Sequence, residues 1–507
     1  MVNRLPALVF WAAAIGLIVF STGCVQEGGK ADLAPAAEED LSPVTQISQN
    51  DRIFFLKRTH FAFRPTELQT LNQMGYEPYL DWMLTLQQDP ALEAAALAAT
   101  VADVEFPSTA ELSRWWCWLM VHNPNAFQER LALFWHDHFA TSTDVLEAGE
   151  RYWFFNHINL WRFQGTSGLP DLLHNMSIDW AMLKWLDGYV STRTAPNENF
   201  AREFWELFTL GADNGYTEAD IQEASRAFTG YRRIFVPDAA GPGRDQFIMQ
   251  WDPNRHDNTS KSIFGQTFAG NGQQEYRDMV TFTLSHRGVA EFIARKIWEE
   301  FVYEDPSPGL VSKLGKNLRG KNYDLRAFLK MIFTSKAFFS SRARQSIIKN
   351  PIEHHIGFMR ATGLEITTNR MDSNLNTIGQ RPTQPPTVNG WPSGFFWLSS
   401  QAMVERANFL RDCVYYRAEA PQVGYDVSTL ILPNETADWQ VVDRLAFLLQ
   451  VKLTAAQRDE CILYLNSDRN SGGVFSQTWD FGDAVQKEKK IRGLLYILGQ
   501  HPTYHLR

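Results

Sequence analysis

The chain has 507 residues, of which 44% are hydrophobic and 13% aromatic, so it holds enough apolar material for a large buried core. Its formal net charge is −9 at pH 7 and no basic stripe offsets this acidic balance, which argues against a nucleic-acid-binding protein. Beyond residue 49 the sequence shows no second linker and no internal repeat, and we expect one large domain over residues 50–507.

The first 24 residues have the pattern of an export signal. Arg4 supplies the positive start, residues 5–20 form an uncharged apolar run, and the run ends in Ser21-Thr22-Gly23-Cys24. This ending resembles a lipobox, with Ser21 where a lipobox usually has Leu. We expect Cys24 to be the acylated N-terminus of an exported lipoprotein in the periplasm or outer membrane. The alternatives are an ordinary cleaved signal peptide and an uncleaved anchor.

Residues 25–49 are small, polar and rich in Ala, Pro and Glu. They show no hydrophobic period, which is typical of an extended, flexible tether. The predicted order is therefore a signal peptide over residues 1–24, a tether over 25–49, and a globular domain from residue 50.

Helical periodicity dominates the globular part, because apolar residues recur three and four positions apart. We therefore predict a mainly α fold. The clearest predicted helices are Thr66–Met74, Pro78–Gln87, Ala110–Val121, Ala126–Phe139, Tyr276–Leu284, Val289–Val302, Leu325–Phe333, Pro351–Thr362, Gln401–Tyr415, Trp439–Leu449, Ala455–Leu465 and Lys487–Leu498.

His136 and His138 stand near the end of one of these helices. A His-x-His pair can hold one metal ion when the backbone is extended, because alternate side chains then share a face. On a helix the two side chains diverge by about 200°. Shared ligation therefore requires the helix to end near Trp135, or only one histidine to bind. The alternative is that His138 is a hydrogen-bonded core residue and His136 a surface residue.

The stretch Asn197–Tyr231 combines carboxylates, an arginine and amides at unusual density. We predict two short amphipathic helices joined by a turn that contains Gly211. Helical spacing places Arg202, Glu203 and Glu206 on one stripe, which makes them candidate catalytic residues. The alternative is structural, with Arg202 pairing with Glu198 and Glu206 at four-residue spacing.

A change of period follows this stretch, between Tyr231 and Phe268. Two β-like runs flank a Gly- and Pro-containing turn, which predicts a small β-hairpin insert over residues 231–268. Within it, His256 and Asp257 lie in a polar loop. A histidine beside a carboxylate can act as a base or as a metal ligand, so we treat His256 as a candidate ligand and Asp257 as a candidate catalytic residue. Ordinary turn formation is the alternative.

Three further features of the sequence indicate structural rather than catalytic or binding roles. The segment Thr367–Trp397 is rich in Pro and Gly and predicts a loop. Cys117, Cys413 and Cys461 form no paired motif, and their odd number allows at most one disulfide in an oxidising compartment. Buried free thiols are their expected state. The numerous tryptophans could form a carbohydrate platform, but a helical core absorbs such residues as well, and we expect the core.

Several segments together resemble a known family. They are RTHFAFRPT (Arg58–Thr66), FWHDHFATS (Phe134–Ser142), NENFAREFWELFTLG from Asn197, GYTEADIQEASRAFTGY from Gly215, the His256–Asp257 pair, ARKIWEEFV (Ala294–Val302) and VNGWPSG (Val388–Gly394). In this order they are similar to a bacterial family catalogued as domain of unknown function 1800, over roughly residues 50–505. The resemblance implies a mostly helical, exported protein, often encoded beside a sulfatase-like partner. It implies no reaction.

Two classes of function follow. One is a cell-envelope enzyme with a His/Glu/Asp site and a divalent metal ion as candidate cofactor. The other is a non-catalytic lipoprotein that holds or matures a sulfatase-like exported partner. An enzyme of the first class needs His136 or His138, Glu203 or Glu206, and His256 in one cleft. A scaffold needs an exposed apolar or aromatic surface instead.

Overall fold

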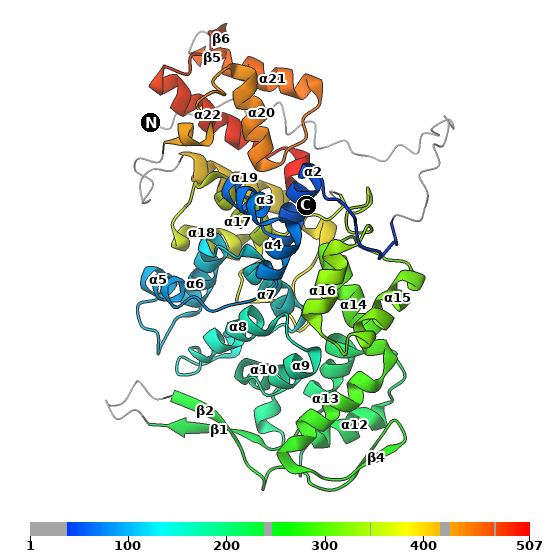
Figure 1. Cartoon of the computed structure of the whole chain (residues 1–507). Helices are drawn as coiled ribbons and strands as arrows, with labels where there is room; N and C mark the ends of the chain where they lie inside the picture. The colour runs from blue at the N-terminus through cyan, green and yellow to red at the C-terminus, as the bar shows by residue number, and fades with distance from the viewer. Residues whose placement is uncertain (1–37, 238–245, 345, 416–425, 471–472) are drawn as a thin grey trace.

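The computed structural model describes residues 38–237, 246–344, 346–415, 426–470 and 473–507 (Figure 1). The predicted signal peptide, Cys24, residues 25–37 of the predicted tether and the turn at residues 238–245 lie outside the described residues. No helix within the described ranges is both long enough and apolar enough to span a bilayer.

The fold is mainly α-helical, as predicted. The first third contains α2 (Gln49–Thr59), α3 (Pro65–Met74), α4 (Tyr76–Met83), α5 (Pro90–Thr100), α6 (Thr109–His122), α7 (Ala126–His138), α8 (Trp153–Gln164), α9 (Leu169–Ser177) and α10 (Trp180–Trp185). The middle contains α11 (Glu198–Glu203), η4 (Phe204–Thr209), α12 (Glu218–Ala227), α13 (Glu275–Ser285), α14 (Arg287–Phe301), α15 (Pro308–Gly320) and α16 (Leu325–Thr334). The last third contains α17 (Pro351–Thr362), α18 (Thr368–Ile378), α19 (Ser400–Tyr415), α20 (Asp438–Leu449), α21 (Ala455–Leu465) and α22 (Ala484–Gly499).

Short 3₁₀ segments connect several of these helices. They are η2 (Thr143–Val145), η3 (Gly188–Val190), η5 (Gly272–Gln274), η6 (Gly394–Leu398), η7 (Val427–Leu430) and η8 (Pro502–His505). In Figure 1, α20, α21 and α22 form one end of the molecule, α12, α13 and the strands within residues 231–268 form the opposite end, and α7 lies between them. One apolar core runs through the whole arrangement, from Phe54 to Tyr504.

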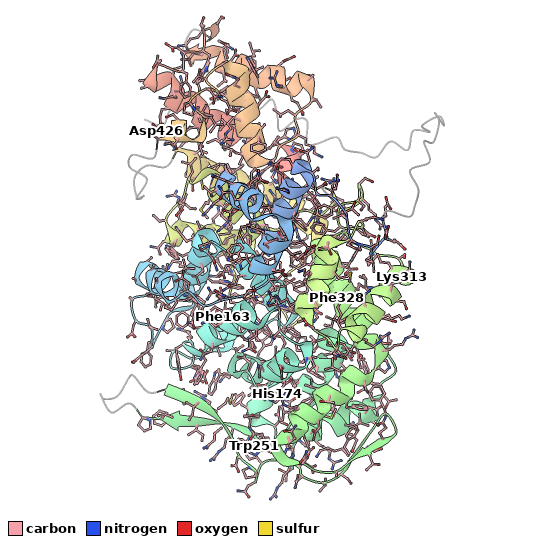
Figure 2. All side chains as sticks on the ribbon, viewed as in Figure 1. Phe163, His174, Trp251, Lys313, Phe328 and Asp426 are labelled. Carbon is pink, nitrogen blue, oxygen red and sulfur yellow. The ribbon has the colours of Figure 1, made fainter. Side chains whose placement is uncertain are left out.

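The predicted β insert is confirmed as two short antiparallel hairpins. Strand β1 (Tyr231–Val236) pairs with β2 (Gln246–Trp251), and β3 (Lys261–Ile263) pairs with β4 (Gln266–Phe268). Gly230 precedes β1 with φ +115°, and a Cβ there would collide with the ring of Trp251, which Figure 2 labels. Only glycine therefore lets the chain turn tightly under that ring.

One prediction about secondary structure was wrong, and two further features were not predicted. The predicted loop Thr367–Trp397 begins with helix α18, which Thr367 caps and which buries Met371 and Leu375 at helical spacing. The first helix of the central stretch changes into the π-helix η4 at Phe204. A third hairpin, β5 (Ser467–Asn470) with β6 (Gly473–Ser476), was not predicted.

Several tryptophans and all three thiols are buried, as expected. Trp115, Trp116 and Trp161 are fully buried in the core. Each such ring removes a large apolar area from water, which stabilises the fold by about 1.5–3 kcal/mol. Cys117, Cys413 and Cys461 are free and buried, and burial raises the pKa of Cys117 and Cys413 so that both stay protonated and unreactive.

A candidate site at the end of helix α7

Helix α7 brings three neighbouring polar residues to its C-terminal end. It is buried along its length from Ala126 to His136, and Phe139 ends it with a non-helical backbone. Successive residues on a helix point about 100° apart. His136, Asp137 and His138 therefore enter three different surroundings, although they are adjacent in sequence.

Asp137 is held by a loop from the far end of the sequence. Its Oδ1 atom accepts a hydrogen bond from the backbone N–H of Trp391, at 2.8 Å. The preceding Gly390 has φ +79°, and a Cβ at that position would collide with the Asp137 carboxyl and backbone carbonyl. Position 390 therefore requires glycine for two reasons: its φ angle is positive, and there is no room for a Cβ beside Asp137. The other carboxyl oxygen, Oδ2, makes no hydrogen bond to any described residue.

The surroundings of Asp137 favour its protonated form. Burial raises the pKa of Asp137 to about 7, and the charge of Glu300 adds to this, while the Trp391 N–H, Lys296 and Arg130 oppose it. The residue is still partly exposed to solvent. A carboxyl that reaches solvent and titrates near neutral pH can both give and take a proton.

His138 is fixed by the π-helix. Its Nε2 lies 3.0 Å from the carbonyl oxygen of Phe208, within η4. A carbonyl only accepts, so Nε2 carries the hydrogen and Nδ1 keeps a lone pair. Burial and the charge of Lys296 lower the pKa of His138 to about 3, so the ring is neutral at physiological pH. The Nδ1 atom of a neutral, oriented imidazole can accept a hydrogen bond or bind an electrophile.

The carbonyl of Phe208 is available because it lies in the last turn of the π-helix η4, where backbone carbonyls have no partner further along the helix. Leu210 and Gly211 both donate their N–H groups to the carbonyl of Trp205, so the hydrogen-bond ladder skips a residue. The Thr209 hydroxyl donates to the carbonyl of Phe204 in the same turn. Single-turn π-helices often mark functional sites because they redirect backbone groups in this way.

His136 points into the core and begins a buried hydrogen-bonded chain. Its Nδ1 lies 3.2 Å from Nε2 of His157, and Nδ1 of His157 lies 2.7 Å from Oδ1 of Asp179. The indole N–H of Trp161 donates to the same Nε2 of His157. Burial and the neighbouring His157 hold the pKa of His136 well below its usual range. The alternative that placed His136 at the surface was therefore wrong.

Asp179 connects this chain to a shallow surface depression. The depression has a volume of about 400 Å³ and is lined by Asn156, Asn159, Leu160, Phe163, Gln164, Asn175 and Asp179. Phe163 is labelled in Figure 2, near the end of α8. A second depression, of about 590 Å³, lies between the start of α20 and the segment before α22. It includes Thr436, Asp438 and Trp479.

The carboxylates of the central stretch form an ion-pair cluster. Arg202 contacts Glu198 at 3.4 Å, Glu206 at 3.5 Å and Glu218 at 2.6 Å. These groups are partly exposed, and the pairing with Glu198 and Glu206 is the structural alternative considered above. Burial and the charge of Glu206 raise the pKa of Glu203, which makes no hydrogen bond to a described residue.

His256 and Asp257 have structural partners. His256 is buried, with Nε2 at 3.0 Å from Oε1 of Glu275 and Nδ1 at 3.0 Å from the carbonyl of Thr229. Glu275 also pairs with the buried Lys261 at 2.6 Å. Asp257 accepts a hydrogen bond from Arg226 at 2.7 Å. Burial would raise the pKa of Asp257, but the hydrogen bonds from Arg226 and Thr259 outweigh it and hold that pKa well below the usual value.

The residues predicted as one site thus have separate partners. Among the described residues, no hydrogen bond or ion pair joins His138, Glu203 and His256, and no group of three His, Cys, Asp or Glu side chains is arranged to hold a metal ion. Metal binding by His136, His138 and His256 stays a prediction. The sequence argument overlooked Asp137, although it stands between the two histidines, and it overlooked His157 and Asp179, which carry no local signal.

A comparison with known protein families bears on most of the chain. A family model described as "Protein of unknown function (DUF1800)" matches residues 54–506. Neither a curated protein nor a solved structure was found to match the chain. The matched range contains α7, the π-helix η4 and the loop that carries Trp391, so the site at the end of α7 lies within it.

Proposed function

Since the chain belongs to the family described as "Protein of unknown function (DUF1800)", which names no reaction, we propose its function from the geometry at the end of α7. The proposal is an exported, membrane-anchored cell-envelope enzyme in which Asp137 exchanges a proton with a bound substrate. The observation that carries it is the double fixation of neighbouring side chains, Asp137 by the Trp391 N–H and His138 by the Phe208 carbonyl.

The two side chains have complementary roles. Asp137 uses Oδ2 to donate or accept the proton, while Oδ1 stays bound to Trp391. His138 offers the lone pair of Nδ1 to a hydroxyl or N–H group of the substrate and so orients it. Lys296, whose charge acts on both residues, favours negative charge that develops on the substrate. A positioned acid or base of this kind contributes about 10²–10⁴-fold to a rate.

A divalent metal ion is supported only weakly by this donor set. Consecutive helical residues offer an ion one carboxylate oxygen and one imidazole nitrogen in directions about 100° apart. The predicted third ligand, His256, is bound to Glu275 and Thr229. We therefore derive no step through a metal.

The proposed location comes from the sequence. The apolar run that ends in Thr22-Gly23-Cys24 supports export and lipid anchoring at Cys24. The short tether that follows would keep the folded domain close to the periplasmic or outer membrane surface.

A second candidate function rests on exposed aromatic residues. Phe395 is 81% exposed and Phe396 59% exposed, on the segment that follows Trp391, and Val404 on α19 is 58% exposed. Exposed aromatic side chains favour contact with another protein. They support the alternative in which the chain holds or matures a sulfatase-like exported partner without catalysis.

One experiment separates the two candidates. Chromogenic carboxylate, phosphate and sulfate esters and glycosides are offered to the wild type, to Asp137→Asn and to the exposed control Asp459→Asn between pH 5 and 9. An enzyme loses at least about 100-fold of its rate in Asp137→Asn alone, and an unchanged rate in that variant overturns the proposal. Absence of turnover, together with loss of partner capture in Phe395→Ser but not in the exposed control Val474→Ser, supports the second candidate instead.

A further inference from the structure

One face of helix α8 carries side chains that are unusual for a buried or an exposed helix face. They recur at helical spacing and so form one stripe, made of Asn156, Asn159, Leu160, Phe163 and Gln164. A stripe that faces the core is normally apolar, and one that faces water normally carries charges. This stripe carries three amides, two apolar side chains and no charge. It lines the surface depression of about 400 Å³, and Figure 2 labels its Phe163.

The opposite wall of this depression comes from α9 and from the start of α10. Asn175 lies on α9, and Asp179 caps α10 by accepting the backbone N–H of Met182 at 3.1 Å. Among the described residues, Asp179 is the only charged one in the lining. Five of the seven lining residues are polar, whereas sites for apolar ligands are lined mainly by hydrophobic side chains. The depression therefore suits a small ligand with polar groups over most of its surface.

Hydrogen bonds hold the amide side chains of the lining in place. Oδ1 of Asn159 accepts a hydrogen bond from Nη1 of Arg162 at 2.8 Å, and Arg162 is itself fixed by the buried Glu129. Oε1 of Gln164 accepts a hydrogen bond from Nδ2 of Asn175 at 2.7 Å. These contacts leave the Nδ2 of Asn159, the Nε2 of Gln164 and the Oδ1 of Asn175 without a partner among the described residues. The two amide nitrogens are free donors, and the oxygen is a free acceptor.

The carboxyl group of Asp179 is also held from the interior. The indole N–H of Trp161 donates to Nε2 of the buried His157, so the hydrogen of the neutral His157 ring lies on Nδ1. This Nδ1 donates to Oδ1 of Asp179 at 2.7 Å. The Oδ2 atom of Asp179 therefore remains as an acceptor for a ligand. Because the fold already fixes these side chains, a ligand that binds them has less conformational freedom to remove.

The mixture of donors and acceptors indicates the chemistry of the ligand. Gln164 and Asn175 are bonded to each other, so a free donor and a free acceptor lie close together. A hydroxyl group both donates and accepts and can use such a pair, whereas the oxygens of an anion only accept and would be repelled by Asp179. The ring of Phe163 offers an apolar surface to the C–H groups of a ligand. Several hydroxyl groups on an apolar carbon ring are the defining features of a sugar.

We propose that the depression between α8 and α9 binds a neutral saccharide. The amides of Asn156, Asn159 and Gln164 contact its hydroxyl groups from one side, Asn175 and Asp179 contact them from the other, and Phe163 packs against its carbon ring. The volume of about 400 Å³ lies within the range of small-molecule sites. Asp137 does not line this depression, and the proposal does not depend on the proposed enzymatic function.

The test uses the full chain carrying Cys24→Ala, which removes the predicted acylation site. Calorimetric titrations at millimolar concentration use the neutral disaccharides cellobiose, maltose, lactose and N,N′-diacetylchitobiose, and the acidic disaccharide digalacturonate. The variants are Asn156→Ala and Phe163→Ala. Asn156 is exposed and its side chain makes no hydrogen bond to a described residue, so the fold does not depend on it. The matched control is Asn376→Ala, which removes an exposed asparagine from another helix, α18.

We expect at least one neutral disaccharide to bind, and digalacturonate to bind more weakly. Asn156→Ala should weaken the affinity about three- to tenfold and Phe163→Ala about tenfold, while Asn376→Ala leaves it unchanged. If Phe163→Ala lowers the melting temperature, Asn156→Ala decides the result.

Absence of binding by all four neutral disaccharides overturns the proposal, as does stronger binding of digalacturonate or an unchanged affinity in Asn156→Ala. Asp137→Asn should bind the saccharide normally, so this result is distinguishable from any result on activity.

Discussion

Asp137 and Trp391 are 254 positions apart in the sequence, yet the carboxyl of one accepts the backbone N–H of the other at 2.8 Å. This contact joins the end of α7 to the loop that precedes η6. Because the loop must pass directly over Asp137, its conformation and the chemistry of the carboxyl depend on each other. The first two predictions below test that dependence, and the others test the roles assigned to Glu275, Glu203 and Cys24.

Asp137→Asn should change how stability depends on pH. The pKa of Asp137 is raised from 3.8 to about 7 in the folded chain, so the folded state binds more protons between about pH 4 and pH 7. The wild type therefore loses stability as pH rises through this window, and Asn removes the loss. The upper bound is about 4 kcal/mol, and less is expected because the carboxyl is partly exposed. Urea unfolding at pH 5 and pH 8 measures it, and equal slopes in both proteins would contradict the raised pKa.

Gly390→Ala should destabilise the fold more than a matched glycine substitution. Gly390 and Gly265 have similar positive φ angles, +79° and +71°, but a Cβ meets Asp137 at the first and open space at the second. Both variants bear about 1–2 kcal/mol of backbone strain. The collision adds to this only at Gly390. Denaturant midpoints of the two variants give the difference directly, and equal midpoints would show that the loop can move away from Asp137.

Glu275→Gln should be among the most disruptive single changes outside the core. It leaves Lys261, which is 1% exposed, without a counterion and weakens the contact to His256. Removing one partner of a buried ion pair costs about 3–5 kcal/mol. Glu218→Gln is the control, because its partner Arg202 is partly exposed and such pairs contribute less than about 1 kcal/mol. Thermal unfolding compares the two, and a mild effect of Glu275→Gln would reopen His256 as a functional histidine.

Glu203→Gln should leave stability unchanged or slightly increased at neutral pH. Arg202 contacts Glu198, Glu206 and Glu218 rather than Glu203. The substitution therefore removes repulsion from Glu206 without leaving a cation unpaired. A fall in melting temperature of several degrees would show that Glu203 supports the helix after all, whereas loss of activity with an unchanged fold would assign it to the site.

Cys24→Ala should move the protein from the membrane fraction to the soluble periplasm. The basis is the apolar run that ends in Thr22-Gly23-Cys24. Fractionation of cells expressing both forms, with Cys461→Ala as the control thiol, measures the change. If Cys24→Ala stays in the membrane fraction, the uncleaved anchor considered above becomes the better description.

The sequence predicts those helices and strands whose formation depends on the pattern of their own residues. Helices such as α16 and α17 follow the spacing of their own apolar residues, and the hairpins between Tyr231 and Phe268 follow a change of period. Helix α18 was hidden because the prolines after residue 381 dominate the composition of its segment, although Thr367 carries a capping signal. The π-helix depends on the hydrogen bond from the Thr209 hydroxyl and on the two N–H groups that donate to the carbonyl of Trp205. The spacing of apolar residues in the sequence shows neither feature.

The sites were less predictable because segments distant in sequence assemble them. His138 was found from its motif, but the position of the Asp137 carboxyl is fixed by Trp391 and the orientation of the His138 ring by Phe208. Lys57 and Lys349 look like ordinary surface lysines in the sequence. Their burial follows only from the packing of segments that are distant in the sequence, as where Lys349 bonds to the backbone of His505.

The number of residues in the π-helix has one further consequence. Its wider turn holds one residue more than an α-helical turn would, between Phe204 and Thr209. Deleting a single residue there would restore regular winding and rotate everything after it by about 100°. The carbonyl of Phe208 would then face away from His138, and the ring would be free to place its hydrogen on either nitrogen. The position of the hydrogen on the His138 ring is therefore set by the number of residues in a helix on another part of the chain.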